Sequence, residues 1–182
     1  MKCPVCRSKQ LKSVNLEEHL NAKTCSQCEG NWISSEEYQK WLDQQKETLP
    51  EKEPEVSFDI KDNTKAKLCP QCDRILIKYK VGHGVDFFLD HCSSCNGVWF
   101  DKNEWDALKE RNLHDEVHYM FTKSWQKKIR DEEIREMLNK MYVSKFGKDS
   151  YEEAKRIREW LQEQPETMTL LAFLSDEDPY QL

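Results

Sequence analysis

The sequence reads C-S-S-C-N-G-V-W over residues 92–99 and C-S-Q-C-E-G-N-W over residues 25–32. A cysteine pair of the form C-P-x-C stands upstream of each stretch, at residues 69–72 and 3–6 respectively. The spacing matches closely, because 19 residues separate the two pairs in the first case and 18 in the second. Self-similarity of this kind identifies an internal repeat. We call residues 1–46 copy one and residues 67–112 copy two.

Every one of the eight cysteines belongs to a C-x2-C pair, and the four pairs form two quartets. A C-x2-C pair turns the backbone so that both sulfurs face one ion, and two such pairs complete a tetrahedral shell. Four protein ligands leave no open position for water, so the role of each ion is structural. The sequence therefore predicts two Zn²⁺ ions, one per four-cysteine site. The ligands are Cys3, Cys6, Cys25 and Cys28 for the first and Cys69, Cys72, Cys92 and Cys95 for the second.

Other uses of paired cysteines fit less well. Disulfides need an oxidising compartment, and no apolar run at the start of the sequence marks a secretory signal. Thiol redox folds use one C-x2-C pair rather than four in matched quartets. Four thiolates also hold iron, so the spacing alone leaves zinc versus iron open.

Each copy reads as a β-hairpin followed by a helix. In copy two, apolar residues alternate over 75–81 and 85–89 around a Gly82-His83-Gly84 turn, whereas the alternation over 11–22 in copy one is weaker. Ser34-x-x-Glu37 and Asp101-x-x-Glu104 predict capping boxes that open helices of about a dozen residues, ending near Gln45 and Arg111.

Two residues of the repeated stretch are conspicuous beside the cysteines. Gly30 and Gly97 follow the last cysteine of each quartet by two positions, which suits a positive-φ position in the knuckle. Trp32 and Trp99 are expected to pack over their own hairpins.

The rest of the chain divides into a linker and a helical region. Residues 47–66 form an acidic, proline-containing linker, and its segment 56–60 is either a short edge strand or extended chain. Residues 113–182 carry apolar residues at helical spacing, with a phase slip at 130–133 that predicts a kink or a restart. Gly147 predicts a helix end, Ser150-x-x-Glu153 a third capping box, and Pro165 the start of a last helix.

The composition favours small units over one large core, since 34% of residues are charged and 37% are hydrophobic. Small units of this kind need a metal or disulfides. The predicted fold class is a small metal-stabilised α+β protein, with two hairpin-plus-helix modules followed by a helical C-terminal region. The domains are 1–46, the linker 47–66, 67–112, and a helical interaction region at 113–182.

The order C-P-x-C, hairpin, C-x-x-C-x-G-x-W and acidic helix start resembles the transcription factor zinc-finger family, the TFIIB-type zinc ribbon. The resemblance covers residues 1–45 and 67–111, and copy two fits it better. Copy one has Asn31 where copy two has Val98, and Ser34 where copy two has Asp101. The resemblance implies the zinc-ribbon fold and zinc on the eight cysteines. It leaves the function open, because ribbons of this type bind DNA, RNA or proteins.

The remaining features favour binding over catalysis. No nucleophile elbow, phosphate loop or zinc-protease helix occurs, so we do not expect an enzyme. We expect a cytoplasmic adaptor that binds a protein partner, with no membrane contact and with possible self-association through residues 113–174. One alternative is a redox-sensing zinc protein.

A second alternative is nucleic-acid binding, which a net charge of −6 disfavours globally. Three groups of basic residues could still form local faces: Arg7, Lys9, Lys12 and Lys23; Arg74, Lys78 and Lys80; and Lys123, Lys127, Lys128 and Arg130.

Overall fold

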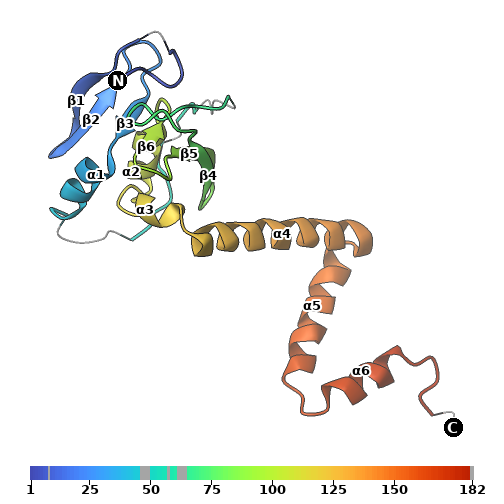
Figure 1. Cartoon of the computed structure of the whole chain (residues 1–182). Coiled ribbons are helices and arrows are strands. Elements are labelled where there is room, and N and C mark those ends of the chain that lie inside the picture. The colour runs from blue at the N-terminus through green and yellow to red at the C-terminus, as the bar shows by residue number, and fades with distance from the viewer. Residues whose placement is uncertain (8, 46–49, 57, 61–64, 181–182) are drawn as a thin grey trace. The chain divides into compact units, whose positions relative to one another are not determined.

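The structure is a computed structural model that describes residues 1–7, 9–45, 50–56, 58–60 and 65–180. Its internal contacts divide the chain into a first unit, Met1–Ile129, and a second unit, Arg130–Leu182. Figure 1 labels the helices and strands of both units. The first unit holds both copies of the repeat and the second is helical.

One six-stranded antiparallel sheet runs through both copies in the order β1-β2-β3-β6-β5-β4. Copy one supplies β1 (Lys12–Glu17), β2 (Leu20–Thr24) and β3 (Asn31–Ile33). Copy two supplies β4 (Ile77–Gly82), β5 (Val85–His91) and β6 (Val98–Phe100). Both hairpins and the α+β fold class are confirmed, with His83 and Gly84 in the turn between β4 and β5.

The two copies meet where β3 pairs with β6. In that register Trp32 lies opposite Trp99, its own counterpart in the repeat. Antiparallel pairing of equivalent residues relates the copies by an approximate two-fold rotation. They also share one hydrophobic core, in which Ile33 and Trp41 of copy one join Phe87 and Trp105 of copy two. Separate small units were therefore the wrong expectation, because an exposed third strand in each copy is satisfied by pairing with the other.

The repeated glycines and tryptophans hold the copies together. A Cβ atom on Gly97 would lie 2.2 Å from Cζ2 of Trp32, and one on Gly30 would lie 2.2 Å from Cζ2 of Trp99. Neither glycine has a positive φ. One expectation is thus wrong, because each glycine is needed for close approach rather than for its backbone angles. Each tryptophan packs among the cysteines of both quartets and also against the glycine of the other copy.

A short helix follows the third strand of each copy. Helix α1 (Ser35–Leu42) begins as predicted, with the Ser34 Oγ accepting from the Glu37 N–H at 3.3 Å. Helix α2 (Glu104–Glu110) keeps half of its capping box, since the Asp101 N–H donates to Glu104 Oε2 at 2.8 Å. With eight and seven residues, both helices are shorter than the predicted dozen.

The described part of the linker packs on copy two. The Asn112 side chain donates to the Pro50 carbonyl at 2.9 Å, and the Asn103 side chain donates to the Asp59 carbonyl at 3.1 Å. Phe58 and Ile60 pack against the shared core. No strand forms at residue 56 or at 58–60, so this segment is extended chain, while Ser57 lies outside the described residues.

Short helix α3 (Val117–Met120) and the start of α4 (Lys123–Phe146) also cover copy two. The Trp125 indole N–H donates to the Val81 carbonyl at 2.9 Å, and its ring stacks on His83 with centroids 4.6 Å apart. Ile129 is buried against Gly82, where a Cβ would lie 2.7 Å from its Cγ1. Residues that sequence analysis assigned to the C-terminal helical region therefore complete the fold of copy two.

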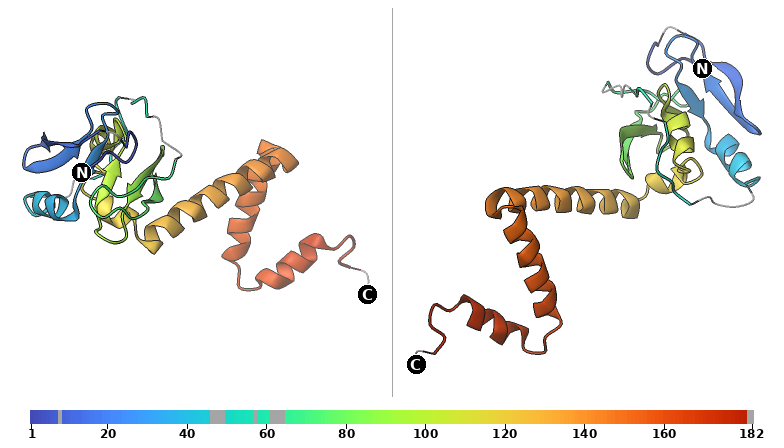
Figure 2. Two further views of the ribbon diagram at one scale, coloured as in Figure 1. Left: turned by 45° about the horizontal axis from the view of Figure 1, so that its top comes forward. Right: turned by 180° about the vertical axis from the view of Figure 1, so that it is seen from behind.

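The second unit continues with α5 (Lys148–Gln162) and α6 (Thr167–Ser175), which Figure 2 shows from two further directions. Helix α4 is unbroken at residues 130–133, so the predicted kink is wrong. The phase slip instead falls next to Ile129, the last residue of the first unit. Gly147 ends α4 as predicted, with φ +79°. Ser150 lies inside α5 and does not cap it, because that helix already begins at Lys148.

Candidate metal centres

Four similar backbone turns carry the eight cysteines. In each C-x2-C pair, the residue after the second cysteine donates its N–H to the carbonyl of the first cysteine, at 2.8–2.9 Å. That residue has a left-handed backbone with φ between 55° and 59°. The four residues are Arg7, Glu29, Asp73 and Asn96. Non-glycine residues adopt this conformation at a cost of about 1 kcal/mol or more, which ligation of an ion by the turn offsets.

The turns bring the cysteines together in the two predicted quartets. Within each quartet all four sulfurs lie within 4.8 Å of one another. In the first, Sγ of Cys3 lies 3.6 Å from that of Cys28, and Sγ of Cys25 lies 3.9 Å from that of Cys6. In the second, the sulfurs of Cys69 and Cys95, and those of Cys72 and Cys92, are separated by 3.5 Å.

These distances suit a tetrahedral metal ion. Zinc–sulfur bonds of about 2.3 Å place the corners of a tetrahedron about 3.8 Å apart, close to the spacings found here. A disulfide would need about 2.05 Å, and all eight cysteines are free thiols. In each quartet two cysteines are buried and two are half-buried.

Backbone donors aimed at the sulfurs favour the thiolate form that binds metal. Burial works to raise the pKa of Cys25, but the backbone N–H groups of Cys28 and Gln27 lower it to about 7. In the second quartet burial likewise opposes ionisation of Cys92, and the N–H groups of Cys95 and Ser94 lower its pKa to about 7. A thiol that ionises near neutral pH supplies the first ligand to an incoming ion.

Burial raises the pKa of Cys28 and of Cys69, so these thiols ionise only when a cation compensates the cost of charge. The residues present thus fit a divalent ion in both quartets. A bound ion would cross-link the two turns that supply its ligands.

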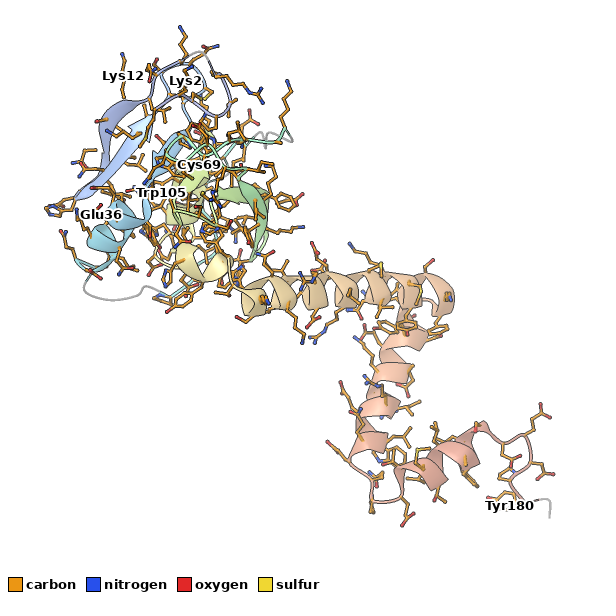
Figure 3. The ribbon with its side chains drawn as sticks, in the orientation of Figure 1. Lys2, Lys12, Glu36, Cys69, Trp105 and Tyr180 are labelled. Carbon is orange, nitrogen blue, oxygen red and sulfur yellow. The ribbon has the colours of Figure 1, made fainter. Side chains whose placement is uncertain are left out.

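A buried ion network beside the second quartet was not foreseen from the sequence. The Lys67 ammonium lies 2.5 Å from Asp90 Oδ2 and 2.6 Å from Asp101 Oδ2. Asp101 Oδ1 accepts from the Trp99 indole N–H at 2.8 Å. Lys67 and Asp90 each stand two positions before a cysteine of the second quartet, a spacing that could have marked them as neighbours of the site. Figure 3 shows Cys69 and Trp105 inside the first unit, with Lys12 and Glu36 at its surface.

The neighbouring histidines do not form a metal site with the cysteines. Within the described residues, the cysteine quartets are the groups of possible ligands that lie close enough to hold an ion. His91 is buried and stacks on Phe121 with ring centroids 4.2 Å apart, and burial lowers its pKa. It is therefore a neutral packing residue beside Cys92.

Two cysteine quartets on paired hairpins define a zinc-ribbon protein, here with two ribbons in one chain. Comparison with known families agrees: the transcription factor zinc-finger family matches residues 2–44 and again residues 63–111. The two matches cover half of the chain, so the chain belongs to the transcription factor zinc-finger family. No curated protein and no solved structure matches it.

Proposed function

We propose that the chain is an adaptor for protein–protein interaction whose first unit is stabilised by two zinc ions. The observation that carries this proposal is the exposed apolar surface of the second unit. Among its described residues only Leu161 is a buried hydrophobic, whereas the first unit holds a continuous core. Large apolar side chains left in water favour association with a partner.

The exposed apolar residues lie on all three helices of the second unit. Met168 is 76% exposed and Leu174 is 55% exposed, although α6 is apolar in composition. The others are Ile134, Met137, Met141, Tyr142, Phe146, Ile157, Trp160, Leu171 and Phe173. Fully burying one such side chain contributes about 1.5–3 kcal/mol, so a few of them suffice to bind a partner.

Zinc is the ion that the family implies, and the cysteine geometry accommodates it. We propose one Zn²⁺ per quartet and, from eight reduced thiols, a reducing compartment such as the cytoplasm. Among the described residues no helix has both the length and the apolarity needed to cross a membrane.

Capture of partners by the tagged full-length chain tests the adaptor role. Leu171→Ser combined with Leu174→Ser should remove captured proteins, because both side chains are about half exposed on α6. Leu68→Ser with Ile75→Ser is the matched control, since these two apolar side chains are 46% and 65% exposed on the first unit. Equal loss in both double variants, or no loss in either, contradicts the proposal.

Nucleic-acid binding is the second candidate. Its support is the family description together with four exposed basic residues on the first turns of α4: Lys123, Lys127, Lys128 and Arg130. Against it, Lys78 and Lys80 of copy two lie 3.5 Å from Asp90 and Asp86, which reduces their attraction for phosphate. Fluorescence anisotropy with random duplex DNA decides, and affinity well below micromolar at physiological salt puts this function first.

The redox-sensing alternative has the half-buried cysteines as its support. Cys6, Cys28, Cys72 and Cys95 are each within partial reach of solvent, so an oxidant could attack them and release the ion. Zinc release by dilute peroxide, reversed when a thiol reductant and zinc are added back, is the result that favours it.

A further inference from the structure

The two copies differ at the place where copy two buries a charged network. There the Lys67 ammonium contacts two carboxylates, and the Asp101 carboxylate also accepts from the Trp99 indole. All three charged side chains are almost completely shielded from water. Each charge is paired, as buried charges require.

Copy one has different residues at the equivalent positions. The backbone identifies them: the Leu76 N–H donates to the Lys67 carbonyl, and the Leu11 N–H donates to the Met1 carbonyl in the same way. The strand register does so as well, because Asp90 lies opposite Trp99 and Lys23 lies opposite Trp32.

The side-chain charges at these three positions therefore differ between the copies. Met1, Lys23 and Ser34 in copy one occupy the positions of Lys67, Asp90 and Asp101 in copy two. The carboxylate that accepts from Trp99 therefore has no equivalent beside Trp32. Accordingly the Trp32 indole nitrogen is buried and has no hydrogen-bond partner among the described residues.

A cavity of about 940 Å³ lies at this position, and we call it the copy-one cavity. Its lining includes Lys23, Trp32, Ser34 and Glu37, and copy two contributes Gln71 and Cys95. At the equivalent position in copy two, the buried Lys67 side chain contacts Asp90 and Asp101. Copy one thus combines an open space beside Trp32 with the loss of the carboxylate.

Lys23 is a cation at the copy-one cavity that has no counterion among the described residues. The Lys23 ammonium donates to Ser13 Oγ at 2.7 Å and forms no ion pair with a described residue. Glu37 accepts from Asn21 at 2.8 Å, Asp43 accepts from Gln39 at 2.7 Å, and Glu36 pairs with Lys40 at 2.6 Å. The three acidic groups of the lining are therefore already engaged.

We propose that the copy-one cavity binds a carboxylate group between Lys23 and the indole nitrogen of Trp32. The bound carboxylate takes the position that Asp101 has in copy two, with Lys23 as its cation and Trp32 as its neutral donor. Trp105 also has an indole nitrogen with no described partner, so that feature alone identifies no site. Trp32 differs from Trp105 because a lysine without an acidic partner, Lys23, and an open cavity both lie beside it.

The Trp32 nitrogen is itself covered, so binding includes a local shift of the neighbouring side chains. Acidic residues also line the cavity, and their charge disfavours a polyanion relative to a single carboxylate. Such a group comes from an acidic side chain of a protein or from a free small carboxylic acid. The chemistry of recognition is the same for both.

The test uses the zinc-loaded full-length chain, labelled with ¹⁵N in its six tryptophan indoles, and follows their N–H resonances by NMR. The probes are sodium acetate, a blocked Gly-Glu-Gly peptide, its Gly-Gln-Gly counterpart and sodium chloride. The expected result is a saturable shift of the Trp32 resonance with acetate and with the glutamate peptide, and none with the other two. Tighter binding of the peptide assigns the site to a protein side chain, and tighter binding of acetate assigns it to a small acid.

Two variants and one control separate the site from general effects. Lys23→Gln should weaken binding by about tenfold or more, because a hydrogen bond to a charged group is lost. Lys12→Gln removes a lysine from the exposed strand of the same hairpin and should leave binding unchanged. Ser34→Asp supplies the carboxylate within the chain, so it should move the Trp32 resonance without any probe and abolish the titration.

Unchanged zinc content and unchanged shifts of the other indoles show that each variant is folded. Failure of both carboxylate probes to move Trp32 overturns the proposal. So does equal binding by Lys23→Gln and Lys12→Gln, or normal titration of Ser34→Asp.

Discussion

The contact between Gly97 and Trp32 allows a sharp test of how the two ribbons are joined. Gly97→Ala places a Cβ 2.2 Å from Trp32 Cζ2 and 2.6 Å from its Cη2, whereas ordinary contacts begin near 3.4 Å. Because Gly97 does not have a positive φ, the alanine backbone is unstrained and the clash between copies is the whole effect. Separating the atoms needs more than about 1 Å, which a close-packed interior resists.

Overpacking of this kind costs about 1–3 kcal/mol, and a displacement this large places Gly97→Ala at the upper end. Trp32→Phe removes the ring atoms that clash and costs about 2 kcal/mol by itself through lost packing. The double variant Gly97→Ala/Trp32→Phe should therefore be less destabilised than the sum of the two, by about 1 kcal/mol or more.

The matched control is Gly97→Ala/Trp99→Phe. The three atoms nearest to a Cβ on Gly97 all belong to Trp32, whereas Trp99 supplies those nearest to a Cβ on Gly30. The destabilisation caused by Gly97→Ala and that caused by Trp99→Phe should therefore add. The assay is urea unfolding of the full-length chain, followed by tryptophan fluorescence and circular dichroism at fixed free zinc. Reciprocal packing of the copies would be refuted if Trp32→Phe and Trp99→Phe reduced the destabilisation caused by Gly97→Ala equally. It would also be refuted if Gly97→Ala lowered the free energy of unfolding by less than about 0.5 kcal/mol.

The metal sites and the buried carboxyl of Glu104 carry three further predictions. Elemental analysis of the purified chain should find two zinc ions, and Cys95→Ser should reduce the content to one, since three remaining thiolates bind far more weakly. A chelator should remove the ion of copy one first, because copy two is covered by the linker, Trp125 and Ile129. Segment-resolved hydrogen exchange should then show faster exchange in β1 and β2 than in β4 and β5, and the reverse order contradicts this reasoning. Burial raises the pKa of Glu104 well above its ordinary value near 4.5, so the unfolded chain releases this proton at lower pH than the folded one. Because the unfolded chain ionises Glu104 first, the free energy of unfolding falls as pH rises above about 4.5. Glu104→Gln lacks this loss, so it should become more stable than the unaltered chain as pH rises from about 5 to about 8. A constant difference between the two proteins across that range would show that Glu104 is ionised in the fold.

The two copies differ in how completely later segments of the chain cover them. Copy two is closed by its ion network and covered by later segments, which suits a structural role. Copy one keeps its helix α1 and its ligand turns but leaves a cavity beside Trp32. Residues that depart from the family pattern, Asn31 and Ser34, stand at or next to that cavity.

The features that could be predicted from the sequence are the ones that local chemistry determines. A C-x2-C turn directs its sulfurs within four residues, and alternation or capping is a property of one strand or one helix start, so the quartets, the hairpins and α1 were foreseen. The helices α4 and α5 were foreseen for the same reason. The end of α4 at Gly147 was predicted correctly, whereas the predicted cap of α5 at Ser150 was wrong. The predicted kink was wrong because residues 130–133 are compatible with a helix. A shift in which face of the helix is apolar leaves its backbone hydrogen bonds intact.

Only the tertiary structure decided how the two copies combine. The pairing of β3 with β6 joins residues far apart in the chain, and no local pattern marks a strand of three residues as an edge that needs a partner. For the same reason the glycines were misread: Gly30 and Gly97 are needed because an indole from the other copy lies against them. Burial of Lys67 and the cavity beside Lys23 likewise depend on which side chains meet across the sheet. The sequence by itself determined the ligands and the local turns, and non-local packing determined the rest, because a side chain's environment is set by neighbours that the linear order does not reveal.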